Sequence, residues 1–171
     1  IMGIFYGNST SQSHLIADLW RSTTSHQGNT TPLANWERAD SNNQGYVGGM
    51  SESSGIFTFP QNGIYLVTFH CHMYLATTTT ASQRCSAAIR TTTNNSNYYG
   101  AAYGHVHFGG GGYSNSLNTQ ATASCFIMFD VTDTSNQKVQ FEFGAGQGGE
   151  YTYGSSSTND TYATFLKVGD T

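Results

Sequence analysis

Residues 55–74 read GIFTFPQNGIYLVTFHCHMY and predict two β-strands joined by a tight turn. The first strand, residues 55–60, ends at a proline, which has no amide hydrogen to donate to a neighbouring strand. Residues 61–63 have turn composition, with a glycine free to adopt a positive φ. In the second run, residues 64–75, the odd positions are apolar or aromatic and the even positions are mixed. Because side chains alternate between the two faces of a strand, we expect one face in a core and the other against a second subunit.

Outside this stretch, short alternating or apolar runs recur at regular spacing, with turn residues between them. This pattern is typical of a β-sandwich or jelly roll. The run at residues 14–24, taken alone, is also compatible with a short helix, but the Ser/Thr clusters that flank it favour an edge strand. The ten expected strands are residues 14–24, 36–40, 46–50, 55–60, 64–75, 84–92, 98–108, 117–131, 138–144 and 162–168. We find no internal repeat and no linker, so residues 1–171 are expected to form one domain, with residues 1–11 as a candidate connection to a preceding segment.

Composition limits the kinds of partner. The net charge is −4 at pH 7, so the chain has no basic field that would attract nucleic acid. No run of about 18 apolar residues is present, so we expect no membrane insertion. Aromatic residues make up 13% of the chain and charged residues only 9%, and the remainder is rich in Gly, Ser, Thr and Asn. Such a composition is common on extracellular and virion surfaces.

The opening stretch resembles a known family. Gly55, Phe57, Pro60, Gly63 and Tyr65 stand where the globular heads of the complement-q family, a branch of the tumour-necrosis-factor-like jelly rolls, carry the same residue types. The segment 161–168, TYATFLKV, resembles the closing strand of that family, and the resemblance covers roughly residues 12–169. It implies an all-β, ten-stranded jelly-roll sandwich that assembles as a compact homotrimer.

Three further segments resemble the domains of this fold that bacteriophage virions carry. They are SHLIADLW at residues 13–20, NWER at 35–38 and YATFLKVGDT at 162–171. The resemblance implies a non-enzymatic head on the virion surface, in a tail fibre, knob or capsid attachment, that binds a host cell-surface receptor or glycan and contacts other virion proteins. Two alternatives stay open: a purely structural trimerisation or decoration domain, and a secreted complement-q-like lectin or recognition protein.

The two-sided strand at residues 64–75 indicates where a trimer interface would lie. We expect Leu66, His70 and Tyr74 to face the trimer axis. On the closing strand we expect Tyr162, Thr164 and Leu166 in the core, which leaves Ala163 and Phe165 to the interface. A shift of one residue in register would exchange these two sets.

Tyrosines beside Gly/Asn/Ser loops are the candidate ligand-binding residues. Tyrosine offers a rigid aromatic surface with a hydroxyl, and the small polar residues around it adapt their hydrogen bonds to a ligand. The simpler interpretation places these tyrosines on the solvent face of a sheet. The candidates are Tyr98, Tyr99, Tyr103, Tyr113, Tyr151 and Tyr153.

We expect no catalytic site, no cofactor and no metal. The chain contains neither G-x-S-x-G nor H-E-x-x-H, and its acidic residues are too scattered to form a catalytic pair. The pairs His70/His72 and His105/His107 each share one face of a strand, but no third ligand is spaced to complete a metal site. Cys71, Cys85 and Cys125 are expected to be buried reduced thiols, although a Cys71–Cys125 disulfide stays open.

Overall fold

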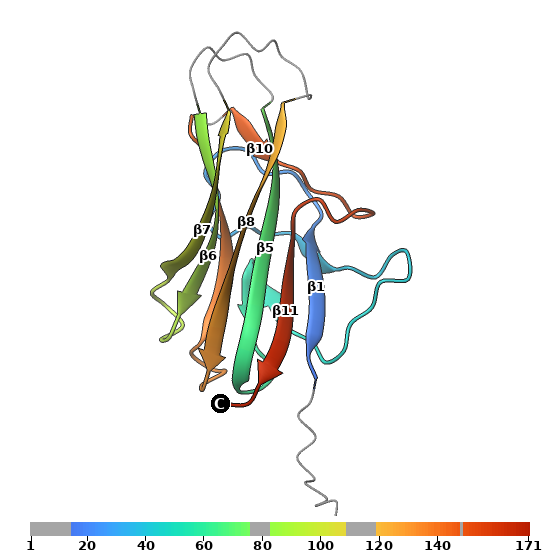
Figure 1. Ribbon diagram of the computed structural model, residues 1–171, viewed down its shortest axis with the longest axis vertical. Helices are drawn as coiled ribbons and strands as arrows, with labels where there is room; N and C mark the ends of the chain where they lie inside the picture. The colour runs from blue at the N-terminus through green and yellow to red at the C-terminus, as the bar shows by residue number, and fades with distance from the viewer. Residues whose placement is uncertain (1–14, 76–82, 109–118, 148) are drawn as a thin grey trace, which may run out of the picture.

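The structure, a computed structural model, describes residues 15–75, 83–108, 119–147 and 149–171, which fold into two packed antiparallel β-sheets (Figure 1). Within these ranges the strands are β1 (Ala17–Ser22), β2 (Trp36–Arg38), β3 (Ser51–Ser53), β4 (Ile56–Thr58), β5 (Gly63–Leu75), β6 (Gln83–Thr92), β7 (Tyr99–Phe108), β8 (Gln120–Val131), β9 (Lys138–Gly144), β10 (Glu150–Thr152) and β11 (Tyr162–Gly169). The described part of the chain holds no helix long and apolar enough to cross a membrane.

We name the two sheets by their strands. Sheet A has the order β10-β5-β11-β1-β2, with β8 also paired to β5, and sheet B has the order β3-β4-β9-β6-β7. The predicted all-β jelly-roll sandwich is therefore confirmed. In Figure 1, β5, β8 and β11 run side by side along the long axis of the molecule, and β11 ends near the C-terminus.

The described residues contain eleven strands, against the ten expected. The run predicted at residues 46–50 contributes only an isolated bridge, Val47 to Ala17, because Gly48 takes a φ of +71° and breaks the extended backbone. The strand β3 begins instead at Ser51, and a two-residue turn with positive φ at Ser54 and Gly55 joins it to β4. The strand β10 lies between the expected strands 138–144 and 162–168, where the sequence predicts no strand.

The core lies between the sheets and is centred on aromatic rings. The Phe57 ring of β4 lies 5.5 Å from those of Trp20 and Trp36, 5.4 Å from that of Phe141 and 5.1 Å from that of Phe165. The alternation predicted for residues 64–75 is confirmed in β5, where every odd-numbered side chain from Tyr65 to Leu75 is buried. This strand therefore sets which face of sheet A is inside.

The prediction for the closing strand is wrong. Ala163 and Phe165 are 0% and 1% exposed and lie in the core, whereas Leu166 on the other face is 37% exposed. Phe165 pairs directly with Val67, and residues opposite each other in a sheet share a face, so Phe165 must point inward as Val67 does. Neither Ala163 nor Phe165 can contact a partner subunit, and the register that the sequence left as the alternative is the one observed.

The three cysteines are free and buried. The Cys125 thiol donates a weak hydrogen bond to the Ala87 carbonyl across the sandwich, at 3.7 Å. The disulfide that the sequence left open between Cys71 and Cys125 is not formed.

Candidate functional site

The solvent-facing side of sheet A is apolar near the end where β5 begins. Register places Met128, Leu66 and Leu166 in one row across β8, β5 and β11, and Phe126, Thr68 and Thr164 in the next. Phe126 is 69% exposed and Met128 is 58% exposed, and together they form what we call the apolar knob. Solvent-exposed aromatic and thioether side chains side by side on a flat sheet indicate a contact surface.

A shallow depression lies on the same face, beside the knob, and is lined by residues of β5, β11 and β1. We call it the apolar hollow; its volume is about 310 Å³ and its lining includes Ala17, Leu19, Leu66 and Leu166. Thr164 also lines the hollow, and its hydroxyl hydrogen-bonds to that of Thr68, which pairs with Phe126 of the knob. These two polar groups can therefore be covered by a partner without losing their hydrogen bond.

The other half of this face carries three stacked ring pairs, which we call the aromatic ladder. His70 stacks on Tyr162 at 4.6 Å, His72 on Tyr153 at 5.4 Å and Tyr74 on Tyr151 at 5.2 Å, with interplanar angles of 16–20°. Leu66, His70 and Tyr74 thus share the outer face of β5, in the orientation expected from the sequence. Their participation in an interface stays a prediction.

Both histidines of the ladder have neighbours that fix their rings. His70 Nδ1 lies 2.8 Å from Ser124 Oγ, and His72 contacts Asp160 Oδ1 at 3.4 Å and Gln120 Oε1 at 3.1 Å. Partial burial lowers the pKa of the His70 imidazole below its usual value. Among the described residues, no group of three or more His, Cys, Asp or Glu side chains is placed to hold a metal ion.

The predicted tyrosines do not form one surface. Tyr151 and Tyr153 belong to the ladder on sheet A, whereas Tyr99 and Tyr103 lie on β7 of sheet B and are 70% and 51% exposed. Tyr98 precedes β7 and its hydroxyl is buried. Tyr113 lies outside the described residues. Of the described tyrosines among these candidates, Tyr103 alone lines a second depression, which is described next.

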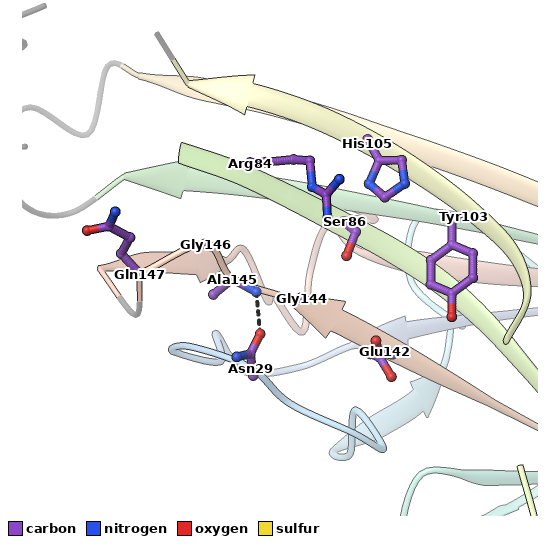
Figure 2. A pocket seen from close by; sticks show the side chains of 10 residues that line it. All are labelled: Asn29, Arg84, Ser86, Tyr103, His105, Glu142, Gly144, Ala145, Gly146 and Gln147. Carbon is purple, nitrogen blue, oxygen red and sulfur yellow. Dashed lines mark hydrogen bonds between the residues drawn. The ribbon is translucent and has the colours of Figure 1, made fainter. Parts of the chain in front are cut away.

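This depression, which we call the cleft, lies on the outer face of sheet B and has a volume of about 530 Å³ (Figure 2). It is lined by Asn29, Arg84, Ser86, Tyr103, His105, Glu142, Gly144, Ala145, Gly146 and Gln147. Strand pairing builds it: Gly144, Ser86 and His105 form one row across β9, β6 and β7, and Glu142, Ala88 and Tyr103 form the next. Ser86 and Ala88, in the middle of the two rows, have small side chains, so a depression forms between the larger side chains on either side.

The glycine at position 144 leaves room on the floor of the cleft for the Ser86 hydroxyl. A Cβ atom at this position would lie 2.3 Å from Ser86 Oγ, so any larger residue would displace the Ser86 side chain. On one wall, the rings of Tyr103 and His105 are parallel, with centroids 6.0 Å apart and an interplanar angle of 4°. Two residues apart on β7, they present a continuous aromatic surface to the cleft.

Hydrogen bonds hold the opposite wall in place. The Ala145 amide donates to Asn29 Oδ1 at 2.7 Å, the contact drawn in Figure 2. The Gln147 amide donates to the carboxylate of Glu150, which is 0% exposed, at 3.2 and 3.3 Å. The Glu150 carbonyl in turn accepts from the Gly28 amide at 3.0 Å. The wall is therefore tied on both sides to the chain around Asn29.

The charges of the cleft are unevenly compensated. Glu142 forms an ion pair of 2.5 Å with Arg90, whose other terminal nitrogen donates to the Tyr98 carbonyl at 2.9 Å. Arg84 is exposed, and no described side chain pairs with its guanidinium. Arg84 is thus a cation of the lining without an ion pair among the described residues, and the buried Glu150 carboxylate behind the wall accepts from the Gln147 amide and has no described cation beside it.

Of the cleft residues, sequence reasoning named Tyr103 as a ligand-binding candidate and His105 as one of a pair of histidines on a strand, and it named none of the others. In the expected strand at residues 84–92, Cys85, Ala87 and Ile89 lie on one side and Arg84 and Ser86 on the other, and the structure buries the first set. Nothing in the sequence placed Asn29 or Glu142 beside them, because their proximity depends on how β9 and the loop around Asn29 pack against β6.

Comparisons with known proteins show the fold. No protein-family profile and no curated protein matches the sequence. A solved structure of Eiger TNF from S. frugiperda superposes with a TM-score of 0.65 at 12% identity, covering 92% of this chain and 94% of that one. Murine APRIL gives a TM-score of 0.59 at 10% identity, with 90% and 99% covered. The globular domain of zebrafish complement 1qA gives 0.54 at 13% identity, with 92% and 98% covered. These similarities confirm a tumour-necrosis-factor-like and complement-q-like jelly roll.

Proposed function

We propose that this chain is a non-enzymatic recognition head that assembles as a homotrimer through the outer face of sheet A and is carried on the surface of a bacteriophage virion. The observation that carries the proposal is the pairing of an apolar knob with an apolar hollow on one face. Phe126 and Met128 supply the first, and Leu19, Leu66 and Leu166 are part of the second.

Because the knob and the hollow lie on one face, two copies can meet with the knob of each in the hollow of the other, as a two-fold dimer, or head to tail, with each knob in the hollow of the next copy. If the knob of one copy enters the hollow of the next, the rotation either closes into a ring or continues as a filament. The resemblance of residues 55–65 to complement-q heads favours a ring of three. Burying Phe126 and Met128 removes large apolar areas from water, at about 25 cal/mol per Å².

Assembly through sheet A leaves the outer face of sheet B directed away from that contact. A trimer presents three copies of each surface, so that weak single contacts add up to firm attachment. The segments 13–20, 35–38 and 162–171 support the virion setting, because they resemble the phage domains of this fold. Attachment to a host surface is the function that we assign to the exposed side.

The mass in solution tests the assembly. Light scattering of the native chain should give about three times 18.5 kDa. Phe126→Asp should give the monomer mass, because it places a charge in the contact. Tyr99→Asp is the matched control: Tyr99 is 70% exposed against 69% for Phe126 but lies on sheet B, and this variant should remain trimeric. A native monomer, or a Phe126→Asp trimer, would contradict the proposal.

A purely structural head is the second candidate, because the apolar face alone suffices to trimerise a fibre. Adsorption of the fluorescently labelled native protein to a panel of bacterial strains separates the two functions. A recognition head adsorbs to some strains and not to others. A trimer that adsorbs to none would favour the structural role.

A further inference from the structure

We infer that the cleft on sheet B binds a saccharide that carries a carboxylate, with Arg84 holding the acid and Tyr103 contacting the sugar ring. The inference rests on the proposed recognition function and names its ligand class. It uses only groups from β6, β7, β9, the chain around Asn29 and the segment after β9.

The positive end of the cleft selects an anion. Arg84 is exposed and has no partner among the described side chains, and Figure 2 shows it extending along the cleft toward Ser86 and His105. A guanidinium presents parallel N–H donors that match the two oxygens of a carboxylate. The one carboxylate in the lining, Glu142, is already neutralised by Arg90 and would repel an anionic ligand little.

The rest of the lining suits a ring with hydroxyl groups. Tyr103 and His105 offer parallel aromatic faces, on which the C–H face of a pyranose can pack. Ser86, Glu142 and Asn29 supply hydroxyl, carboxylate and amide groups for hydrogen bonds. Asn29 Oδ1 already accepts from Ala145, so its amide nitrogen is the group left to meet a ligand.

The length of the cleft fits a ring between the two ends. Tyr103 pairs with Ala88, which lies four residues along β6 from Arg84. At the rise of a β-strand, the backbone of Arg84 is therefore roughly 13 Å from the row that contains Ala88 and Tyr103. The Arg84 side chain spans part of this distance (Figure 2). One sugar ring can then contact Tyr103 while its acid group reaches Arg84.

The site is formed before any ligand arrives. Its far wall is held by the bonds from Ala145 to Asn29 and from Gln147 to the buried Glu150. Glu142 is fixed by Arg90. A preformed cleft loses little conformational entropy on binding, which favours a small polar ligand.

Ligand-observed NMR on the native chain tests the inference. The acidic probes are methyl glucuronide, methyl galacturonide and the methyl glycoside of N-acetylneuraminic acid; methyl glucoside and inorganic phosphate are the references. We expect at least one acidic glycoside to bind ten-fold or more tightly than either reference. Arg84→Gln should remove the preference over methyl glucoside, Tyr103→Ala should weaken binding of that acidic glycoside at least five-fold, and Tyr99→Ala, on the same strand outside the cleft, should leave it unchanged.

Three outcomes would overturn the inference. In the first, none of the three acidic glycosides binds. In the second, phosphate binds as tightly as the acidic sugars, which would mark a simple anion site. In the third, Arg84→Gln and Tyr103→Ala bind like the native chain.

Failure of the proposed function gives different results. A monomeric chain that binds acidic glycosides would refute the homotrimer and would support saccharide binding in the cleft. If the Arg84→Gln and Tyr103→Ala variants adsorb to bacteria as well as the native chain does, the protein attaches to its host through a surface other than the cleft.

Discussion

Asp18 and Arg38 meet through two hydrogen bonds, from Arg38 Nε to Asp18 Oδ1 at 3.0 Å and from Nη2 to Oδ2 at 3.1 Å. The Asp18 side chain is 0% exposed and also accepts from Trp20 Nε1 at 2.9 Å and from the Met50 amide at 2.8 Å. The pair therefore ties β1 to β2 and to the chain just before β3. The hydrogen bond with Asp18 raises the pKa of the Arg38 guanidinium.

Replacement of Asp18 should be strongly destabilising. In Asp18→Ala, Arg38, the Trp20 indole and the Met50 amide lose their common acceptor, and we expect the free energy of unfolding to fall by about 3–5 kcal/mol. Urea denaturation measures this change. Asp130→Ala, which removes an exposed carboxylate of β8, should stay within about 0.5 kcal/mol of the native chain. A loss below 1 kcal/mol in Asp18→Ala would show that the pair contributes little.

Phe57 should be the most sensitive position of the core. Its ring lies between both tryptophans, Phe141 and Phe165, so Phe57→Ala opens a cavity where the two sheets meet. We expect a loss of about 3–5 kcal/mol in the free energy of unfolding. Phe57→Leu keeps most of the volume and should cost less than about 2 kcal/mol. Equal losses in the two variants would mean that the cavity is not the cause.

The orientation of a strand was predictable where one face is uniformly apolar or aromatic and the other face is mixed. On β5, every odd-numbered residue is apolar and buried, so its orientation follows from the sequence. On β11 both faces carry large apolar side chains, and Phe165 and Leu166 cannot be told apart without the register to β5. The strand β10 has no apolar alternation, because its buried residues are Glu150 and Thr152.

The candidate site was predictable only in part. Tyr103 was found because tyrosine beside glycine suggests recognition. Arg84, Glu142 and Asn29 are far apart in the sequence and meet only through the pairing of β6 with β7 and β9 and the packing of a loop. Register between strands that are distant in sequence is set by tertiary packing, which a local pattern does not encode.

The three thiols should be unreactive while the protein is folded. Burial raises the pKa of Cys71 and raises that of Cys85 and Cys125 to about 11. Because the thiolate is the reactive form, a rise of this size lowers its population at pH 8 by a factor of roughly 100. Ellman's reagent should therefore titrate all three cysteines in urea and modify the native chain at least 100-fold more slowly. Rapid modification of one thiol in native buffer would contradict this prediction.

Stability should fall when the pH drops below neutrality. Burial lowers the pKa of His26 and of His70, so between their folded values and about 6.5 the unfolded chain binds more protons than the folded chain. Their contribution is complete above pH 6.5 and is lost as the pH falls through that window. The melting temperature, measured at one protein concentration, should decrease from pH 7.5 to pH 5.5, and His26→Gln and His70→Gln should each show a shallower decrease. A native melting temperature that is constant or higher at pH 5.5, or variants as steep as the native chain, would show that protonation of these two imidazoles is not coupled to unfolding.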